Sequence, residues 1–93
     1  MKQIELKDLE YNKIYYAVYR QIGGNIWHPC PIRKYIDNGR IRFKTFTDII
    51  IDYNVLWHDN RAIDINGHKV ILINTFQTFI AAEDWCNFEN NII

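Results

Sequence analysis

The sequence predicts a mainly β domain of the β-rich α+β class, folded as a small barrel or a strongly bent antiparallel meander of about five strands with one C-terminal helix. Two Asn-Gly dipeptides indicate the strands, Asn38-Gly39 and Asn66-Gly67, because each lies between segments of alternating apolar residues. Asn-Gly suits the type I′ turn of a two-residue hairpin, which needs a positive φ at both central residues. From Thr78 onward the apolar spacing changes to that of a helix. The alternative is an α+β sheet with the helix packed across one face.

Length and composition indicate one globular domain over residues 1–93. The formal net charge is zero, from 11 basic and 11 acidic residues, which disfavours proteins that bind or mimic polyanions. No apolar stretch is long enough to span a membrane, and the N-terminal segment lacks the apolar region of a signal peptide. Two cysteines, Cys30 and Cys86, make a poor disulfide framework, so we expect a cytoplasmic, reducing location and buried thiols.

The first long strand is predicted over residues 13–20, which are rich in β-forming residues. Apolar side chains occupy both of its faces, so we expect a central strand that is covered on two sides. The polar segment before it has three apolar anchors, Ile4, Leu6 and Leu9. Residues 21–31 are predicted to form a loop, because Pro29 and Pro31 cannot donate the hydrogen bonds of a central strand.

The two-residue turn at Asn38-Gly39 fixes the register of the first hairpin. It pairs Asp37 with Arg40, Ile36 with Ile41, Tyr35 with Arg42, Lys34 with Phe43 and Arg33 with Lys44. One face of this hairpin is then apolar and carries Ile32, Ile36, Ile41 and Phe43. The other face is basic and carries Arg33, Tyr35, Arg40, Arg42 and Lys44.

The second hairpin pairs Asp64 with Lys69 and Ile63 with Val70, and the opposite charges of the first pair support this register. Between the hairpins, the alternation over residues 46–57 predicts a further strand that is broken by a bend. The last segment predicts a helix over residues 78–91. Its expected N-cap is Asn74, Thr75 or Thr78. Its apolar residues fall on one broad arc, made of Phe79, Ala81, Ala82, Trp85, Cys86, Phe88 and Ile92.

The order of these elements resembles a loose group of small phage and prophage proteins with an SH3-like barrel. The resemblance rests on a leading strand with a Tyr15-Tyr16 pair, the two hairpins, the Asp64-Ile65-Asn66-Gly67-His68-Lys69-Val70-Ile71-Leu72 segment and a short closing helix around Ala82-Glu83. The resemblance implies an SH3-like fold and a phage or mobile-element origin. One function that it suggests is that of a host-directed inhibitor, such as an anti-defence or anti-CRISPR protein.

The strongest candidate site is the basic hairpin face, which we define as Arg33, Tyr35, Arg40, Arg42 and Lys44. With Lys34, residues 33–47 hold five basic residues against one acidic residue, in a chain of zero net charge. Arginine contacts phosphates and carboxylates in bidentate fashion, and an aromatic ring among arginines can stack on a base. The competing interpretation is a solvated outer face of a meander, where polar residues belong.

Other groups of residues carry weaker signals. Residues 48–64 and 83–93 are acidic, which suits a protein partner or head-to-tail self-association, and the competing and favoured interpretation is the ordinary scatter of charge in a small domain. Trp27 and Trp57 are candidate aromatic anchors, and each can equally be a lid over one end of the fold. The histidines and cysteines lack the paired spacing of a zinc site, and no sequence motif activates a nucleophile, so we expect no metal, no cofactor and no enzymatic activity.

We therefore expect a non-enzymatic binding module that acts by protein–protein contact, as a host-directed inhibitor in the cytoplasm of the host cell if the chain is phage-encoded. The alternative is a nucleotide or nucleic-acid binder that uses the basic hairpin face. A homo-oligomer is compatible with both.

Overall fold

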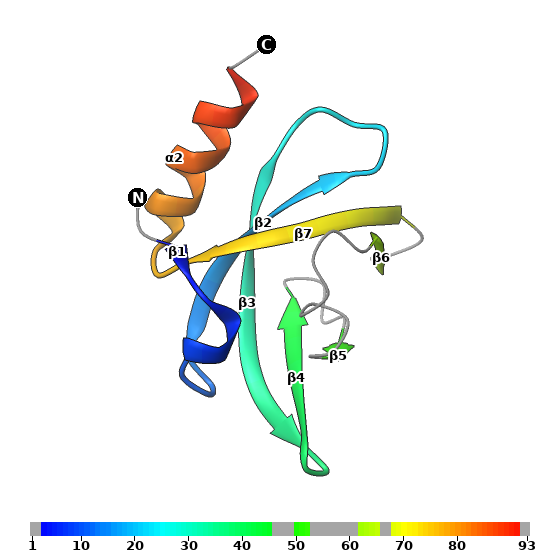
Figure 1. Ribbon diagram of the computed structural model, residues 1–93, viewed down its shortest axis with the longest axis vertical. Helices are drawn as coiled ribbons and strands as arrows, with labels where there is room; N and C mark the ends of the chain where they lie inside the picture. The colour runs from blue at the N-terminus through cyan, green and yellow to red at the C-terminus, as the bar shows by residue number, and fades with distance from the viewer. Residues whose placement is uncertain (1–2, 46–49, 53–61, 66–67, 92–93) are drawn as a thin grey trace.

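The computed structural model describes residues 3–45, 50–52, 62–65 and 68–91, with the backbone alone at 50–52, 62–65 and 68–73. Seven strands, one short 3₁₀ helix and one α-helix follow one another along the chain (Figure 1). Their order is β1 (Gln3–Ile4), η1 (Leu6–Asp8), β2 (Ile14–Gln21), β3 (His28–Asp37), β4 (Arg40–Thr45), β5 (Ile50–Asp52), β6 (Ala62–Ile65), β7 (His68–Phe76) and α2 (Phe79–Asn90).

All strands belong to one antiparallel sheet with the order β1-β7-β2-β3-β4-β5, and β6 also pairs with β7. The mainly β class with one C-terminal helix is therefore confirmed. In the residues described, β5 and β6 do not pair with each other, so the sheet is an open, bent meander and the closed barrel stays a prediction. β1, β5 and β6 are short additions to the four long strands.

The first hairpin has the predicted register in all five pairs, from Asp37↔Arg40 to Arg33↔Lys44. Asn38 and Gly39 have φ values of 50° and 74°, as the type I′ turn requires. In the second hairpin, the pairs Asp64↔Lys69 and Ile63↔Val70 are confirmed, and the turn at 66–67 lies outside the described residues. The turn type therefore sets which side chains of β3 and β4 share a face.

The prediction of a loop up to Pro31 is wrong, because β3 begins at His28 and pairs through both prolines with β2. The pairing of β3 with β4 ends at Ile32↔Thr45. In the described chain, β3 therefore has a strand on one side only at Pro29 and Pro31. Proline is tolerated at such an edge, where its missing N–H removes no ladder bond.

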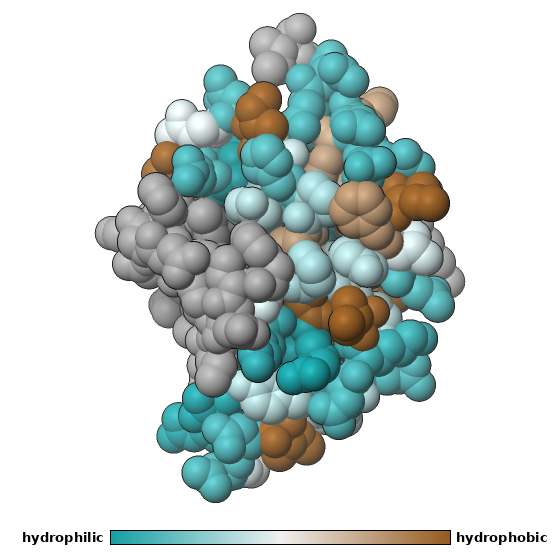
Figure 2. Space-filling view, turned by 180° about the vertical axis from the view of Figure 1, so that it is seen from behind, coloured by the Kyte–Doolittle hydropathy of each residue, from teal (hydrophilic) through white to brown (hydrophobic). Residues whose placement is uncertain are grey.

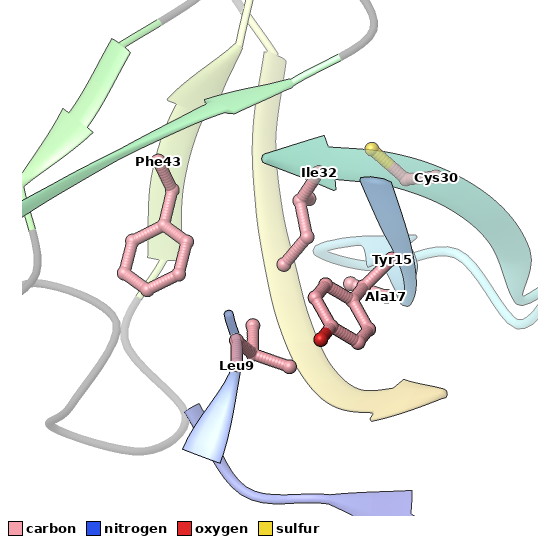
Figure 3. Packing of buried hydrophobic residues seen from close by; sticks show 6 residues of the cluster. All are labelled: Leu9, Tyr15, Ala17, Cys30, Ile32 and Phe43. Atoms are coloured by element: carbon pink, nitrogen blue, oxygen red, sulfur yellow. The ribbon is translucent and has the colours of Figure 1, made fainter. Parts of the chain in front are cut away.

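β2 lies between two clusters of buried side chains, which confirms a central strand covered on both faces. Tyr15 and Ala17 belong to the first cluster (Figure 3), together with Leu9, Cys30, Ile32 and Phe43. Val18 belongs to the second cluster, together with Phe76, Ala82 and Cys86. The alternation along β2 thus joins the hairpin core to the layer under α2.

The helix begins where Thr78 caps it, since the Thr78 hydroxyl accepts a hydrogen bond of 3.1 Å from the Ala81 backbone N–H. Asn74, another expected cap, instead has a φ of 50° beside a shift in the β2–β7 register. The predicted apolar arc is only partly buried. Ala82 and Cys86 are buried, whereas Phe79 and Phe88 are exposed, because the strands cover only one narrow side of α2.

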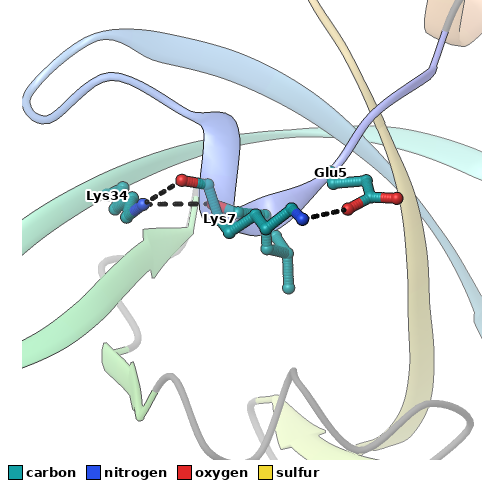
Figure 4. A network of polar contacts seen from close by, with 4 residues as sticks. Glu5, Lys7 and Lys34 are labelled. Atoms are coloured by element: carbon teal, nitrogen blue, oxygen red, sulfur yellow. Dashed lines mark hydrogen bonds and ion pairs between the residues drawn. The ribbon is translucent and has the colours of Figure 1, made fainter.

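The N-terminal segment is held against the sheet by a buried lysine, Lys34 (Figure 4). Its ammonium group donates to the carbonyl oxygens of Leu6, Lys7 and Leu9 at 3.1, 3.3 and 3.3 Å. The Tyr11 ring lies 4.9 Å from the same Nζ. The Lys34 carbonyl in turn accepts from the Asn12 N–H at 2.7 Å. Three donors thus meet three acceptors, which offsets the cost of burying the charge.

We expect Gly39→Ala to lower the free energy of unfolding by about 1 kcal/mol, because alanine is strained at a positive φ. Space does not cause this loss, since a Cβ at Gly39 meets no atom within 4 Å. Gly24→Ala is the matched control, because its φ is not in the left-handed region and its new Cβ would make ordinary contacts. Urea unfolding checks both variants, and an equal effect of the two would contradict the turn assignment.

We expect Lys34→Met to lower the free energy of unfolding by about 3 kcal/mol, since it removes the charged donor from three carbonyl oxygens, of which that of Leu9 is bound in a buried contact. Lys7→Met is the control, because Lys7 is exposed and its ion pair with Glu5 spans 3.5 Å at the surface. That pair is worth less than about 1 kcal/mol. Equal stability of the two variants in urea would show that the Lys34 bonds contribute nothing.

A basic hairpin face as the candidate binding site

The basic hairpin face is built by the alternation of side chains along β3 and β4. Ile32, Lys34, Phe43 and Thr45 are buried on the inner face of the hairpin. Their chain neighbours Arg33, Tyr35, Arg42 and Lys44 therefore project from the opposite face, and Arg40 stands opposite Asp37 next to the turn. The structure thus brings all five predicted site residues together on one side of one hairpin.

Arg33 and Tyr35 form a cation–π pair on this face. The Arg33 guanidinium carbon lies 6.0 Å from the centre of the Tyr35 ring. Arg33 is exposed and Tyr35 is half-buried, so the ring supports the guanidinium while the guanidinium's own hydrogen-bond donors stay accessible to a ligand. This pair combines a planar cation with an aromatic surface, which is a common composition of binding hot spots.

Arg42 is partly neutralised by Asp37. Its Nε lies 3.5 Å from the Asp37 Oδ2, and the geometry is that of an ion pair without a hydrogen bond, since the Nε is buried and has no hydrogen-bond partner in the described chain. The backbone register also places Arg42 opposite Asp52 of β5. Arg42 therefore contributes less free charge to the face than its neighbours Arg33 and Arg40.

The other basic side chains that the structure describes are engaged elsewhere. Lys7 pairs with Glu5 at 3.5 Å, and Lys13 pairs with Glu10 at 3.2 Å. Arg20 donates to the Gly24 carbonyl at 2.9 Å and lies over the Trp27 ring. Of the described cations, only Arg33 and Arg40 make neither a hydrogen bond nor an ion pair. The uncommitted positive charge of the described part is thus concentrated on the basic hairpin face.

Lys34 lowers the number of exposed basic side chains that the sequence predicts for residues 33–47. The alternation that exposes Arg33 places Lys34 on the inner face, where only 4% of its surface is accessible. One of the five basic residues of this segment is therefore structural. The predicted register already pairs Lys34 with Phe43, so its inward direction could be predicted from the sequence. The carbonyl oxygens that bind its ammonium group could not, because they lie far away in the chain.

Trp27 has a structural role and stands apart from the basic hairpin face. Its ring packs edge-on against Trp85 with 5.2 Å between the ring centres. Its backbone N–H donates to the Asn90 Oδ1 at 2.8 Å, and its carbonyl accepts from the Asn90 Nδ2 at 3.1 Å. Trp27 therefore ties the loop before β3 to the end of α2. Trp57 lies outside the described residues.

The cysteines and histidines show no arrangement for chemistry in the part of the chain that is described. Cys30 and Cys86 are free and buried. Burial, with a smaller contribution from the Glu83 carboxylate, raises the pKa of the Cys86 thiol to about 11, so the thiolate is disfavoured. His28 packs against Tyr19 with 5.5 Å between the rings. No group of three or more metal-ligating side chains is found within these residues.

No protein-family model, curated protein or solved structure matches this chain. None of the helices in the described ranges has the length and hydropathy that crossing a membrane requires. The assignment of a function therefore depends on the geometry of the basic hairpin face itself.

The raised pKa of Cys86 predicts a loss of stability in alkaline solution. The folded protein binds this proton more tightly than the unfolded chain, whose thiol has an ordinary pKa near 9.0. The stabilisation is therefore complete below pH 9 and declines as the pH rises toward 11. Between pH 8 and 10.5, we expect the free energy of unfolding to fall by about 2 kcal/mol more in the natural protein than in Cys86→Ala. Parallel pH profiles of the two proteins in urea would contradict this pKa.

Proposed function

We propose that this chain is a non-enzymatic binding module that contacts an acidic surface of another protein through the basic hairpin face. The observation that carries the proposal is the pair of uncommitted arginines, Arg33 and Arg40, on a two-stranded surface whose other side is anchored in the core. Arg33 lies beside the Tyr35 ring and can meet a carboxylate with two of its guanidinium nitrogens. The rigid hairpin reduces the entropy that binding has to overcome.

The distribution of charge favours a protein over a long polyanion as the partner. Asp37 lies within the basic face and neutralises Arg42, and the exposed lysines Lys7 and Lys13 are already paired with glutamates. A protein that follows a phosphate backbone needs several free cations along one path. An acidic protein patch needs only a few complementary charges around a central contact.

A nucleotide or a short nucleic acid is the second candidate, and the Arg33–Tyr35 pair is the observation that favours it. An aromatic ring beside a guanidinium can accept a base on its face while the guanidinium binds a phosphate. Binding of this kind weakens steeply as salt is added, in proportion to the number of phosphates contacted.

The order of the elements predicted from the sequence resembles that of small phage proteins, and this resemblance suggests a class of partner. We propose a protein of the host cell, met in its cytoplasm, with inhibition as the role, as in anti-defence or anti-CRISPR proteins. This part of the proposal rests on the resemblance, whereas the choice of surface rests on the basic hairpin face.

Affinity capture from a host lysate, with and without nuclease, tests the proposal. We expect one protein to be retained in stoichiometric amount after nuclease treatment, and Arg33→Glu with Arg40→Glu to reduce its capture at least tenfold, which corresponds to about 1.4 kcal/mol. Lys7→Glu with Lys13→Glu is the control, because it changes the net charge equally at exposed positions off this face.

Capture that survives the Arg33→Glu, Arg40→Glu change would show that the basic hairpin face is only solvated surface. Capture of nucleic acid alone, lost on nuclease treatment, would move the second candidate into first place. Circular dichroism of each variant establishes that the sheet is retained.

A further inference from the structure

The outward side of α2 is an unpartnered surface that combines apolar and acidic residues. Ile80 and Phe88 are 68% and 62% exposed, and the carboxylates of Glu83 and Asp84 lie between them along the helix. α2 contains three acidic residues and no basic residue. We define Ile80, Glu83, Asp84 and Phe88 as the α2 face.

The α2 face and the basic hairpin face lie at opposite ends of the molecule. Figure 1 shows α2 at one end of the long axis and the β3–β4 turn at the other, in a body that measures 43 Å along that axis. The hairpin end also presents one large apolar side chain, Ile36, which is 58% exposed. Figure 2 shows such hydrophobic side chains as separate spots among hydrophilic ones. Because Ile36 lies on the side of the hairpin opposite the basic hairpin face, the two faces that would meet are complementary in charge, and the α2 face supplies the exposed apolar side chains.

We propose that a second copy of this chain docks its basic hairpin face on the α2 face of the first. Arg33 and Arg40 are the described cations that make neither a hydrogen bond nor an ion pair, and Glu83 and Asp84 are two exposed carboxylates that could meet them. The contact joins two different surfaces, so it is heterologous and repeats head to tail as a chain or a ring. The formal net charge of zero means that no overall repulsion opposes the assembly.

This assembly would compete with the function proposed above, because a hairpin covered by the next copy is closed to any other acidic partner. The α2 face in this sense imitates the acidic surface that the basic hairpin face recognises. Dilution or added salt, which screens the paired charges, would release the hairpin. The inference rests on the proposed function only for the idea that this hairpin binds acidic surfaces.

Sedimentation velocity with charge-reversed variants tests the contact. The hairpin-reversed variant carries Arg33→Glu and Arg40→Glu, and the helix-reversed variant carries Glu83→Lys and Asp84→Lys. We expect the natural protein to show an average mass that rises with concentration at low salt and returns to that of the monomer at high salt. Each reversed variant alone should remain monomeric, and an equimolar mixture of the two should assemble again, because the acidic hairpin of one then meets the basic helix of the other.

Two results would overturn the proposal: a natural protein that stays monomeric at every concentration and at low salt, or reversed variants that assemble as well as the natural protein does. Ile80→Ser with Phe88→Ser provides a variant that keeps all charges, and we expect it to weaken the assembly at least threefold. The helix-reversed variant keeps the basic hairpin face, so it should still capture the partner from the lysate. Failure of self-association is therefore distinguishable from failure of the proposed function.

Discussion

The buried ammonium group of Lys34 is the interaction on which the arrangement of this protein depends. It joins the hairpin of β3 and β4 to a segment more than twenty residues earlier, by hydrogen bonds to two carbonyl oxygens of the 3₁₀ turn η1 and to that of Leu9, the residue after it. Leu9, which supplies one of these oxygens, is itself part of the core cluster beneath the hairpin. A lysine paired with an apolar residue across the strands is tolerated there only because every donor is satisfied.

The same constraint decides where the candidate site lies. Because side chains alternate along a strand, turning Lys34 inward turns Arg33 and Tyr35 outward, and a slip of one residue would reverse both. The Asn38-Gly39 turn and the Lys34 bonds therefore fix one register from two sides, one local and one distant. The hydrogen bonds of Lys34 on the inner face therefore help to decide which side chains form the basic hairpin face. The acidic side of α2 arises independently, since it is the side that the strands do not cover.

Much of the fold could be predicted from the sequence because its signals are local. The turn dipeptide fixes the register of the first hairpin, the two apolar faces identify β2 as central, and the change of spacing locates α2. What could not be predicted depends on partners far away in the chain. The start of β3 at His28 depends on its pairing with β2, the contact of Trp27 with the helix depends on Asn90, and the burial of Lys34 depends on carbonyl groups that no side-chain pattern encodes. The residues of the basic hairpin face could be predicted from the sequence. The structure was needed to identify which of its cations make no ion pair.

The most direct test of this account is a nitrogen-15 NMR spectrum of the lysine ammonium groups at neutral pH, with the Lys34 signal assigned from a Lys34→Arg variant. A buried ammonium held by three carbonyl oxygens exchanges its protons slowly, whereas exposed groups such as those of Lys7 and Lys13 exchange with water too fast to be seen. We expect a sharp Lys34 signal with proton contacts to the Tyr11 ring. A Lys34 ammonium that exchanges as fast as the exposed lysines would contradict the anchoring of the N-terminal segment and the division of faces that depends on it.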